Sequence, residues 1–314
     1  MQRKLYLLGF ITLLISSSLL VQAQSSTIEK VVLHPKDSLK GYYLKWLPQS
    51  QQIDKVLLLL PGFGQTPNTI FEASALPTLA VKHNMLVVAV AGGNTVFANE
   101  LTRKHLDEVI QHVKETHSSV ANKPWVVGGF SAGGTIALRY VAYHEAKVEK
   151  SPANFQGVFT VDSPVDLFGV WTYFERELAR NLSAVGIAEA KYIKQFMEKQ
   201  EGTPSKNTAR YEELTPFHLA IPQGNEIYLQ QVAVRVYHDV DVNWMIQERG
   251  RSVQDTNFFY SSEMINRLRK LGNQRAEFIQ SARKGYRSNG ERHPHDWSIV
   301  EEPACIAWIK SLED

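Results

Sequence analysis

The chain has 314 residues, with 34 lysines and arginines against 32 aspartates and glutamates, a formal net charge of +2. This balance excludes the strongly basic surface that nucleic acid binding needs, and small or neutral partners are expected instead. The single cysteine, Cys305, excludes an internal disulfide, so burial of apolar side chains must stabilise the fold. Because Cys305 lies in an apolar segment of helical character, we expect it to be buried.

The N-terminus is typical of a secretory signal peptide. Two basic residues precede an apolar run from Leu5 to Val21, and a small-residue cleavage site ends at Ala23. The run is shorter than the ~20 residues that a membrane-spanning helix needs. The sequence therefore predicts a signal peptide over residues 1–23, export to the periplasm or the medium, no stable membrane anchor, and a mature domain over residues 24–314.

Apolar runs of strand length alternate with helical patterns along the mature chain. Continuous apolar runs indicate strands that are buried on both faces, as in a parallel sheet. The predicted strands cover 56–60, 85–91, 125–127, 157–161, 232–237 and 276–281. The predicted helices cover 68–83, 99–117, a segment that begins at Ser131, and 298–312. This alternation predicts a mostly parallel central sheet with helices on both faces, and two alternating segments at 28–33 and 41–47 predict an antiparallel hairpin at the sheet edge.

One long segment, from about 167 to 225, interrupts the alternation. It contains no strand pattern and is typical of two or three amphipathic helices. Insertions of this length in a compact domain are usually functional. The sequence predicts a helical cap over the carboxyl edge of the sheet, where open α/β sheets bind ligands; a peripheral pair of helices is the alternative.

The strongest local motif is G-x-S-x-G, from Gly129 to Gly133, between a predicted strand and a predicted helix. Small residues at both ends let the strand and helix backbones approach each other closely. The serine between them, Ser131, stands at a helix start, where the unpaired N–H groups favour developing negative charge. The motif predicts Ser131 as a nucleophile, whereas a serine that only caps the helix is the alternative.

With this motif in its strand-to-helix setting, the sequence resembles the α/β-hydrolase family over nearly all of the mature chain. The resemblance implies an α/β-hydrolase fold and a serine hydrolase that uses no cofactor. It also implies an oxyanion loop after an early central strand, where Pro61-Gly62-Phe63-Gly64 stands, with Pro61 in the place where many relatives have histidine. The backbone N–H groups of Phe63 and Ala132 would then hold the substrate oxyanion.

The family's chain order of nucleophile, acid and base implies an acid after the second strand that follows the serine. Two aspartates stand there, Asp239 at the strand end and Asp241 in the following loop. We favour Asp241, because a carboxylate in the loop can reach across to a histidine, and Asp239 is the alternate, which could instead cap the next helix.

The base is implied on the loop before the last helix, where His293 and His295 stand. His295 directly precedes the helix and is favoured; His293 is the alternate, because Pro294 restricts it to extended geometry. In the implied triad, Ser131 attacks a carbonyl, His295 takes its proton, and Asp241 orients the histidine and stabilises the imidazolium.

The first functional hypothesis is hydrolysis of an ester, with a small-molecule or polymer-derived acyl substrate. The second hypothesis is a peptidase that binds the amine of its substrate. Its candidate carboxylates, which a solvated helix face would also explain, are Glu175, Glu177, Glu212 and Glu213. Acyl transfer would use the same triad, and a binding protein that keeps the fold without the chemistry stays open.

No metal site is predicted. The spacings that could hold a metal are confined to the two histidine segments, namely His293, His295 and Asp296, and His238 with Asp239 and Asp241. A zinc interpretation would leave the serine motif unexplained. The sequence makes no prediction about oligomeric state.

Overall fold

The computed structural model of this chain describes residues 27–147 and 150–312, so the predicted signal peptide lies outside the described residues. The described residues form an eight-stranded sheet in the order β1-β2-β4-β3-β5-β6-β7-β8. The strands are β1 (Glu29–Val32), β2 (Tyr42–Trp46), β3 (Lys55–Leu60), β4 (Met85–Val90), β5 (Pro124–Phe130), β6 (Asn154–Val161), β7 (Ala233–Asp239) and β8 (Ala276–Ser281). All neighbours from β4 to β8 are parallel, which confirms the predicted mostly parallel sheet.

The central strands are buried along their whole length. Every residue of β3, β4 and β5 is buried, which explains why these strands are continuously apolar rather than alternating. The predicted edge hairpin is also confirmed, because β1 pairs antiparallel with β2, and β2 in turn pairs antiparallel with β4.

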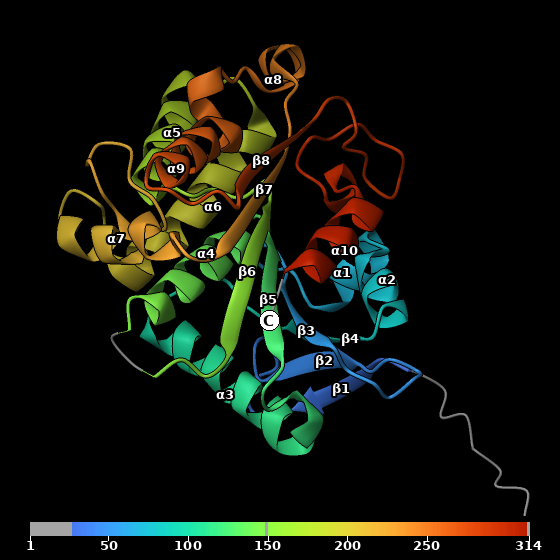
Figure 1. Cartoon of the computed structure of the whole chain (residues 1–314). Helices are drawn as coiled ribbons and strands as arrows, with labels where there is room; N and C mark the ends of the chain where they lie inside the picture. Colours follow the sequence, from blue (N-terminus) through green and yellow to red (C-terminus); the bar gives the residue numbers. More distant parts are fainter. Residues whose placement is uncertain (1–26, 148–149, 313–314) are drawn as a thin grey trace, which may run out of the picture.

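Helices cover both faces of the sheet (Figure 1). One face packs against α3 (Glu100–Thr116), α4 (Ala132–Glu145) and α9 (Asn257–Lys270), and the other against α1 (Asn68–Ala73), α2 (Leu76–Lys82) and α10 (Glu302–Ser311). The helix predicted over 68–83 is thus two helices, since the chain is extended at Ser74 and Pro77 lies in the first turn of α2. The last helix begins later than predicted, also with a proline in its first turn.

The segment predicted as a helical cap contains three helices, α5 (Leu167–Arg180), α6 (Ala184–Glu201) and α7 (Thr208–Leu214). Their apolar side chains form a third cluster, which also contains Val96, Phe97 and Ala132 from the main domain. The remaining helix, α8 (Val242–Arg249), follows β7.

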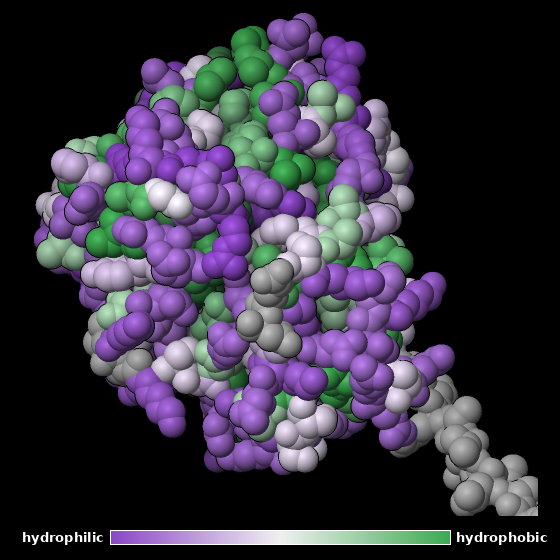
Figure 2. Space-filling model, in the orientation of Figure 1, coloured by the Kyte–Doolittle hydropathy of each residue, from purple (hydrophilic) through white to green (hydrophobic). Residues whose placement is uncertain are grey.

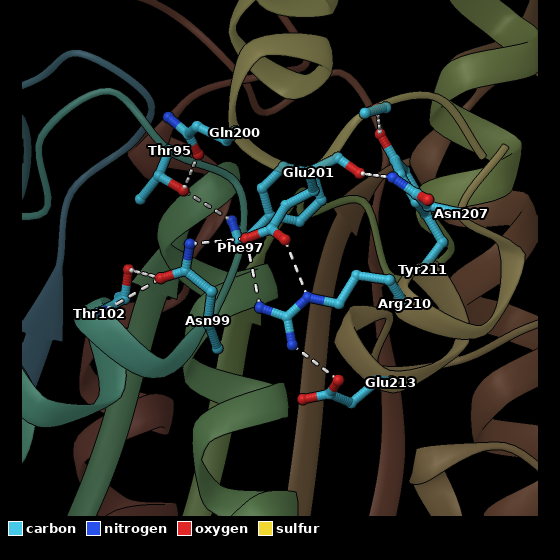
Figure 3. Close-up of polar contacts among 12 residues, drawn as sticks. Thr95, Phe97, Asn99, Thr102, Gln200, Glu201, Asn207, Arg210, Tyr211 and Glu213 are labelled. Atoms are coloured by element: carbon cyan, nitrogen blue, oxygen red, sulfur yellow. Dashed lines mark hydrogen bonds and ion pairs between the residues drawn. The ribbon is translucent and has the colours of Figure 1, made fainter.

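Polar contacts fix the C-terminal end of α6 to the loop before α3 (Figure 3). The Glu201 carboxylate accepts hydrogen bonds from Asn99 Nδ2 at 2.8 Å and Arg210 Nε at 2.8 Å, while Thr95 Oγ1 donates to Gln200 Oε1 at 2.8 Å. The helical segment is therefore attached to the sheet domain by both apolar packing and hydrogen bonds.

Cys305 is fully buried in α10, as expected. Hydrophilic residues cover most of the face seen in Figure 2, with apolar residues in smaller groups between them. Among the described residues, no helix combines the length and the apolar character needed to cross a membrane.

Candidate active site

Ser131 lies on a strained turn between β5 and α4. Its backbone has φ 52° and ψ −124°, a conformation that costs a residue with a side chain about 1–3 kcal/mol. The Ser131 N–H donates to the Val161 carbonyl at 3.0 Å, so the end of β6 helps to hold the turn. Strain of this kind persists only where the surrounding structure imposes it, and it is often found at active sites.

The two glycines of the motif permit a close backbone approach. A Cβ atom at Gly129 would lie 2.3 Å from the Gly133 carbonyl carbon. A Cβ atom at Gly133 would lie 2.4 Å from the backbone oxygens of Leu60 and Pro61. Helix α4 thus starts directly against β5 and the end of β3, as the motif predicts.

A cavity of about 330 Å³ opens beside Ser131. Ser131 and Asp162, at the carboxyl ends of β5 and β6, line it together with His295. Side chains from α5 and α6, including Tyr173 and Glu189, line it as well. The helical segment therefore forms part of the wall around the serine.

His295 is hydrogen-bonded to a carboxylate. Its Nδ1–H donates to Asp162 Oδ2 at 2.6 Å, and its ring packs on Phe130 with the ring centroids 4.6 Å apart. Because Nδ1 carries the proton in this bond, Nε2 is left as the basic nitrogen. Burial by itself would lower the pKa of His295, but the hydrogen bond and charge of Asp162 outweigh it and the pKa is raised.

Asp162 binds two histidines at once. Its Oδ1 accepts from Nδ1 of His238 at 2.8 Å, and the buried His238 ring stacks on Phe278 with centroids 5.3 Å apart. Burial alone would raise the pKa of Asp162, but the hydrogen bonds from His238 and His295 hold that pKa well below its usual range. A buried, ionised carboxylate therefore stands behind His295.

Asp239 and Asp241 bond to Arg292 rather than to His295. Arg292 Nη2 lies 2.8 Å from Asp239 Oδ2 and 3.1 Å from Asp241 Oδ2. Asp241 also caps α8 by accepting from the Trp244 N–H at 3.2 Å, a role that the sequence assigned to Asp239. The two carboxylates hold the loop that carries His295, and Asp162 takes the place beside His295 that the sequence analysis gave to Asp241.

His293, the alternate base, lines the same cavity but has a different partner. Its Nε2 accepts from Nη2 of Arg249 at 2.5 Å. Burial together with the charges of Arg287, His295 and Arg249 lowers the pKa of His293 to about 3. His293 is therefore neutral near pH 7, and its Nε2 is occupied.

Phe63 and Ala132, whose N–H groups were expected to form the oxyanion hole, both line the cavity. The turn at Phe63 is held by a hydrogen bond at Gly62 and by packing of the Phe63 ring. The Gly62 N–H donates to Gln65 Oε1 at 2.9 Å, and the Phe63 ring packs edge-on against Phe196 of α6 at 5.6 Å. The backbone at Phe63 is thus fixed by its neighbours.

The glutamates considered for amine binding do not line the cavity. Glu175 accepts from Trp171 Nε1 at 2.9 Å, and Glu213 pairs with Arg210 at 2.6 Å. Among the described residues, the side chains close enough together to hold a metal are His34, His105 and Glu108, whose ligand atoms lie within 4.8 Å of one another. They belong to the β1–β2 turn and α3, not to the cavity.

Asp162 and His238 were missed by sequence reasoning. The available signal was that Asp162 directly follows a buried strand next to the strand that ends at the serine. Carboxyl ends of neighbouring parallel strands meet at one sheet edge, which places Asp162 near Ser131.

No protein-family model matches the sequence, and no curated protein does. Similar solved structures exist, however. MPT51 of Mycobacterium tuberculosis is 15% identical with a TM-score of 0.58, over 92% of this chain and 100% of that one. Carboxyl esterase 2 of the fungus Tuber melanosporum is 16% identical with a TM-score of 0.56, over 95% of this chain and 89% of that one.

An acylaminoacyl peptidase of Pyrococcus horikoshii is 11% identical with a TM-score of 0.58, over 92% of this chain. The alignment spans only 42% of the peptidase, so that protein has a large part without counterpart here. At these identities the likenesses concern the fold alone, and they confirm the fold predicted from the sequence.

Proposed function

Because this chain has the α/β-hydrolase fold, we propose that it is a serine hydrolase that cleaves a carboxylic ester outside the cytoplasm. Ser131 is the nucleophile, His295 the base, and Asp162 the acid in place of Asp241. One observation carries this proposal: the strained serine shares a cavity with a histidine whose Nδ1 is bonded at 2.6 Å to a buried, ionised carboxylate.

In the first half of the reaction, His295 Nε2 takes the proton of the Ser131 hydroxyl as its oxygen attacks the ester carbonyl. The N–H groups of Phe63 and Ala132 stabilise the negative oxygen of the tetrahedral intermediate. The intermediate collapses when His295 gives the proton to the leaving alcohol oxygen, and an acyl group stays on Ser131.

In the second half, His295 takes a proton from water, and the resulting hydroxide attacks the acyl carbonyl. His295 then returns the proton to the Ser131 oxygen, and the carboxylic acid leaves. Asp162 stays ionised throughout, because its lowered pKa disfavours proton uptake, and its charge stabilises the imidazolium in both halves.

A fluorophosphonate probe tests the nucleophile. The full mature protein should be labelled covalently, and Ser131→Ala should abolish labelling. Ser262→Ala, at an exposed serine of α9, is the matched control and should label as wild type. Wild-type protein that does not react with the probe would contradict the proposal and favour a non-catalytic binding protein.

A substrate screen separates the chemistries that share this triad. Short p-nitrophenyl esters should be hydrolysed in water, while aminoacyl amides should react poorly. The four glutamates considered for amine binding do not line the cavity, and Glu189, which does, pairs with Arg251. Faster cleavage of the amides would instead favour a peptidase. Preferential formation of a new ester with an added alcohol would favour acyl transfer.

Export is proposed from residues 1–23 alone. Expression of the full chain with N-terminal sequencing of the exported protein should give a mature start at Gln24. A variant that lacks residues 2–23 should stay in the cytoplasm as the control. Recovery of full-length protein in the membrane fraction would contradict cleavage.

A further inference from the structure

The cavity beside Ser131 carries three arginines, Arg249, Arg251 and Arg287. Its carboxylates are Asp162 and two more, Glu189 and Asp255. Whether this wall can attract an anion depends on which of these charges are already paired.

Each carboxylate has a cationic or histidine partner. Asp162 bonds to His238 and His295, as described above. Asp255 accepts from Arg180 at 2.8 Å and from Arg176, both on α5 and outside the cavity wall. Glu189 pairs with Arg251 at 3.5 Å.

Arg249 and Arg287 are the other two arginines of the cavity wall. Within residues 27–147 and 150–312, neither forms an ion pair with a carboxylate, whereas Arg251 pairs with Glu177 and Glu189. The wall therefore carries two arginines that form no ion pair with a described carboxylate, although the charge of Glu189 favours the charged form of Arg249.

Arg249 is held in place although it lacks an anionic partner. Its guanidinium lies 5.4 Å from the centre of the Trp244 ring, and one of its nitrogens donates to His293. A guanidinium carries five N–H donors, so this bond leaves donors for a ligand. Burial and the charges of Arg251 and Arg287 lower the pKa of Arg249, which shows that like charges crowd here.

His293 places this group next to the reacting centre. The same ring accepts from Arg249 through Nε2, so Nδ1 carries its proton and donates to the backbone carbonyl oxygen of His295 at 3.2 Å. Arg249 is thus linked to the backbone of the catalytic base through His293, and an anion bound to it would lie inside the cavity that contains Ser131.

From this geometry, and resting on the proposed function, we infer that the enzyme prefers esters that carry a carboxylate, which Arg249 and Arg287 bind. A planar carboxylate matches the paired donors of a guanidinium, so the preference is set by hydrogen bonds as well as by charge. Binding of the carboxylate also relieves the repulsion between the two arginines.

Two matched pairs of substrates test this inference. In the first pair the acyl part carries the charge: the mono-p-nitrophenyl ester of adipic acid against p-nitrophenyl hexanoate. In the second the alcohol part carries it: 4-acetoxybenzoate against 4-methylphenyl acetate. After subtraction of the uncatalysed rate, kcat/KM of wild type should be at least about tenfold higher for the charged member of one pair.

Arg249→Gln and Arg287→Gln should each lower kcat/KM for the charged ester more than for the neutral ester, and so remove most of that preference. Arg283→Gln is the matched control, since Arg283 is on the same loop as Arg287 and is also exposed, but lies outside the cavity wall and pairs with Asp241 at 3.9 Å. Arg249→Lys should keep part of the preference. Raising the salt from 0.05 to 0.5 M should reduce the preference in wild type.

A second readout does not need turnover. Adipate and benzoate should slow fluorophosphonate labelling of wild type more than uncharged adipamide and benzamide do, and Arg249→Gln should abolish this protection. The inference is overturned if labelled, active protein shows neither a charge preference nor protection, or if both persist in the two glutamine variants. Absence of labelling would instead overturn the proposed function itself.

Discussion

Replacement of Asp162 by asparagine is the sharpest perturbation of this site. In the wild type, both Nδ1–H groups of His238 and His295 donate to the two carboxylate oxygens. An asparagine offers one oxygen and one NH2 group, so only one histidine can still donate. If His238 keeps the oxygen, the NH2 group faces His295 Nδ1 and forces the proton onto Nε2, which then cannot take the proton of Ser131.

The expected magnitude follows from this change of tautomer. Loss of the correct tautomer and of the charge that stabilises the imidazolium should lower kcat by about three to four orders of magnitude. Hydrogen bonds to charged groups contribute about 1.5–3 kcal/mol. Because the hydrogen bond and charge of Asp162 raise the pKa of His295, that pKa should be lower in the variant.

The assay is the pH profile of kcat/KM on an ester that wild type hydrolyses. Because the base must be unprotonated and Asp162 raises the pKa of His295, activity of wild type should rise with pH through that raised value. The residual activity of Asp162→Asn should reach its plateau at lower pH.

Asp241→Asn is the control, because that carboxylate bonds to Arg292 and caps α8 without contacting His295. It should lose at most about 1–2 kcal/mol of stability and keep most of kcat. A folded Asp162→Asn that keeps wild-type turnover, together with an Asp241→Asn that loses it, would show that Asp241 is the acid, as predicted from the sequence.

Two further predictions concern stability. Gly133→Ala would press a methyl group against the backbone at Leu60, so urea unfolding should show a loss of about 1–3 kcal/mol or more, whereas Gly92→Ala, with open space around it, should change little. The pKa of His293 is about 3 in the folded protein and about 6.5 in the unfolded chain. The unfolded chain therefore binds the proton first, and wild type loses stability as pH falls from about 6.5 to about 3. His293→Gln should show a smaller loss across that window, and exposed His83→Gln should lose as much as wild type; equal losses in all three would contradict the assignment.

Much of the fold was determined by local sequence pattern. A strand between two neighbours, with helices on both faces, has no polar side, so β3, β4 and β5 are recognisable as apolar runs. The turn at Ser131 is equally local, since only small residues at Gly129 and Gly133 allow α4 to start so close to β5. Both features are visible in short segments of the sequence, although Gly133 also contacts the backbone of Leu60 and Pro61 at the end of β3.

The partner of His295 was decided only by the tertiary structure. The family's chain order implied an acid at the end of β7, where Asp239 and Asp241 stand, yet Asp162 directly follows β6, and β6 and β7 end at the same sheet edge. Arg292 forms ion pairs with Asp239 and Asp241, which keeps both carboxylates from His295. The backbone at Asp162 has a φ of 41°, and the Asp162 carboxylate lies between His238 and His295. Side-chain direction and competition for charge arise between segments 51 to 133 residues apart, and no pattern within one segment records them.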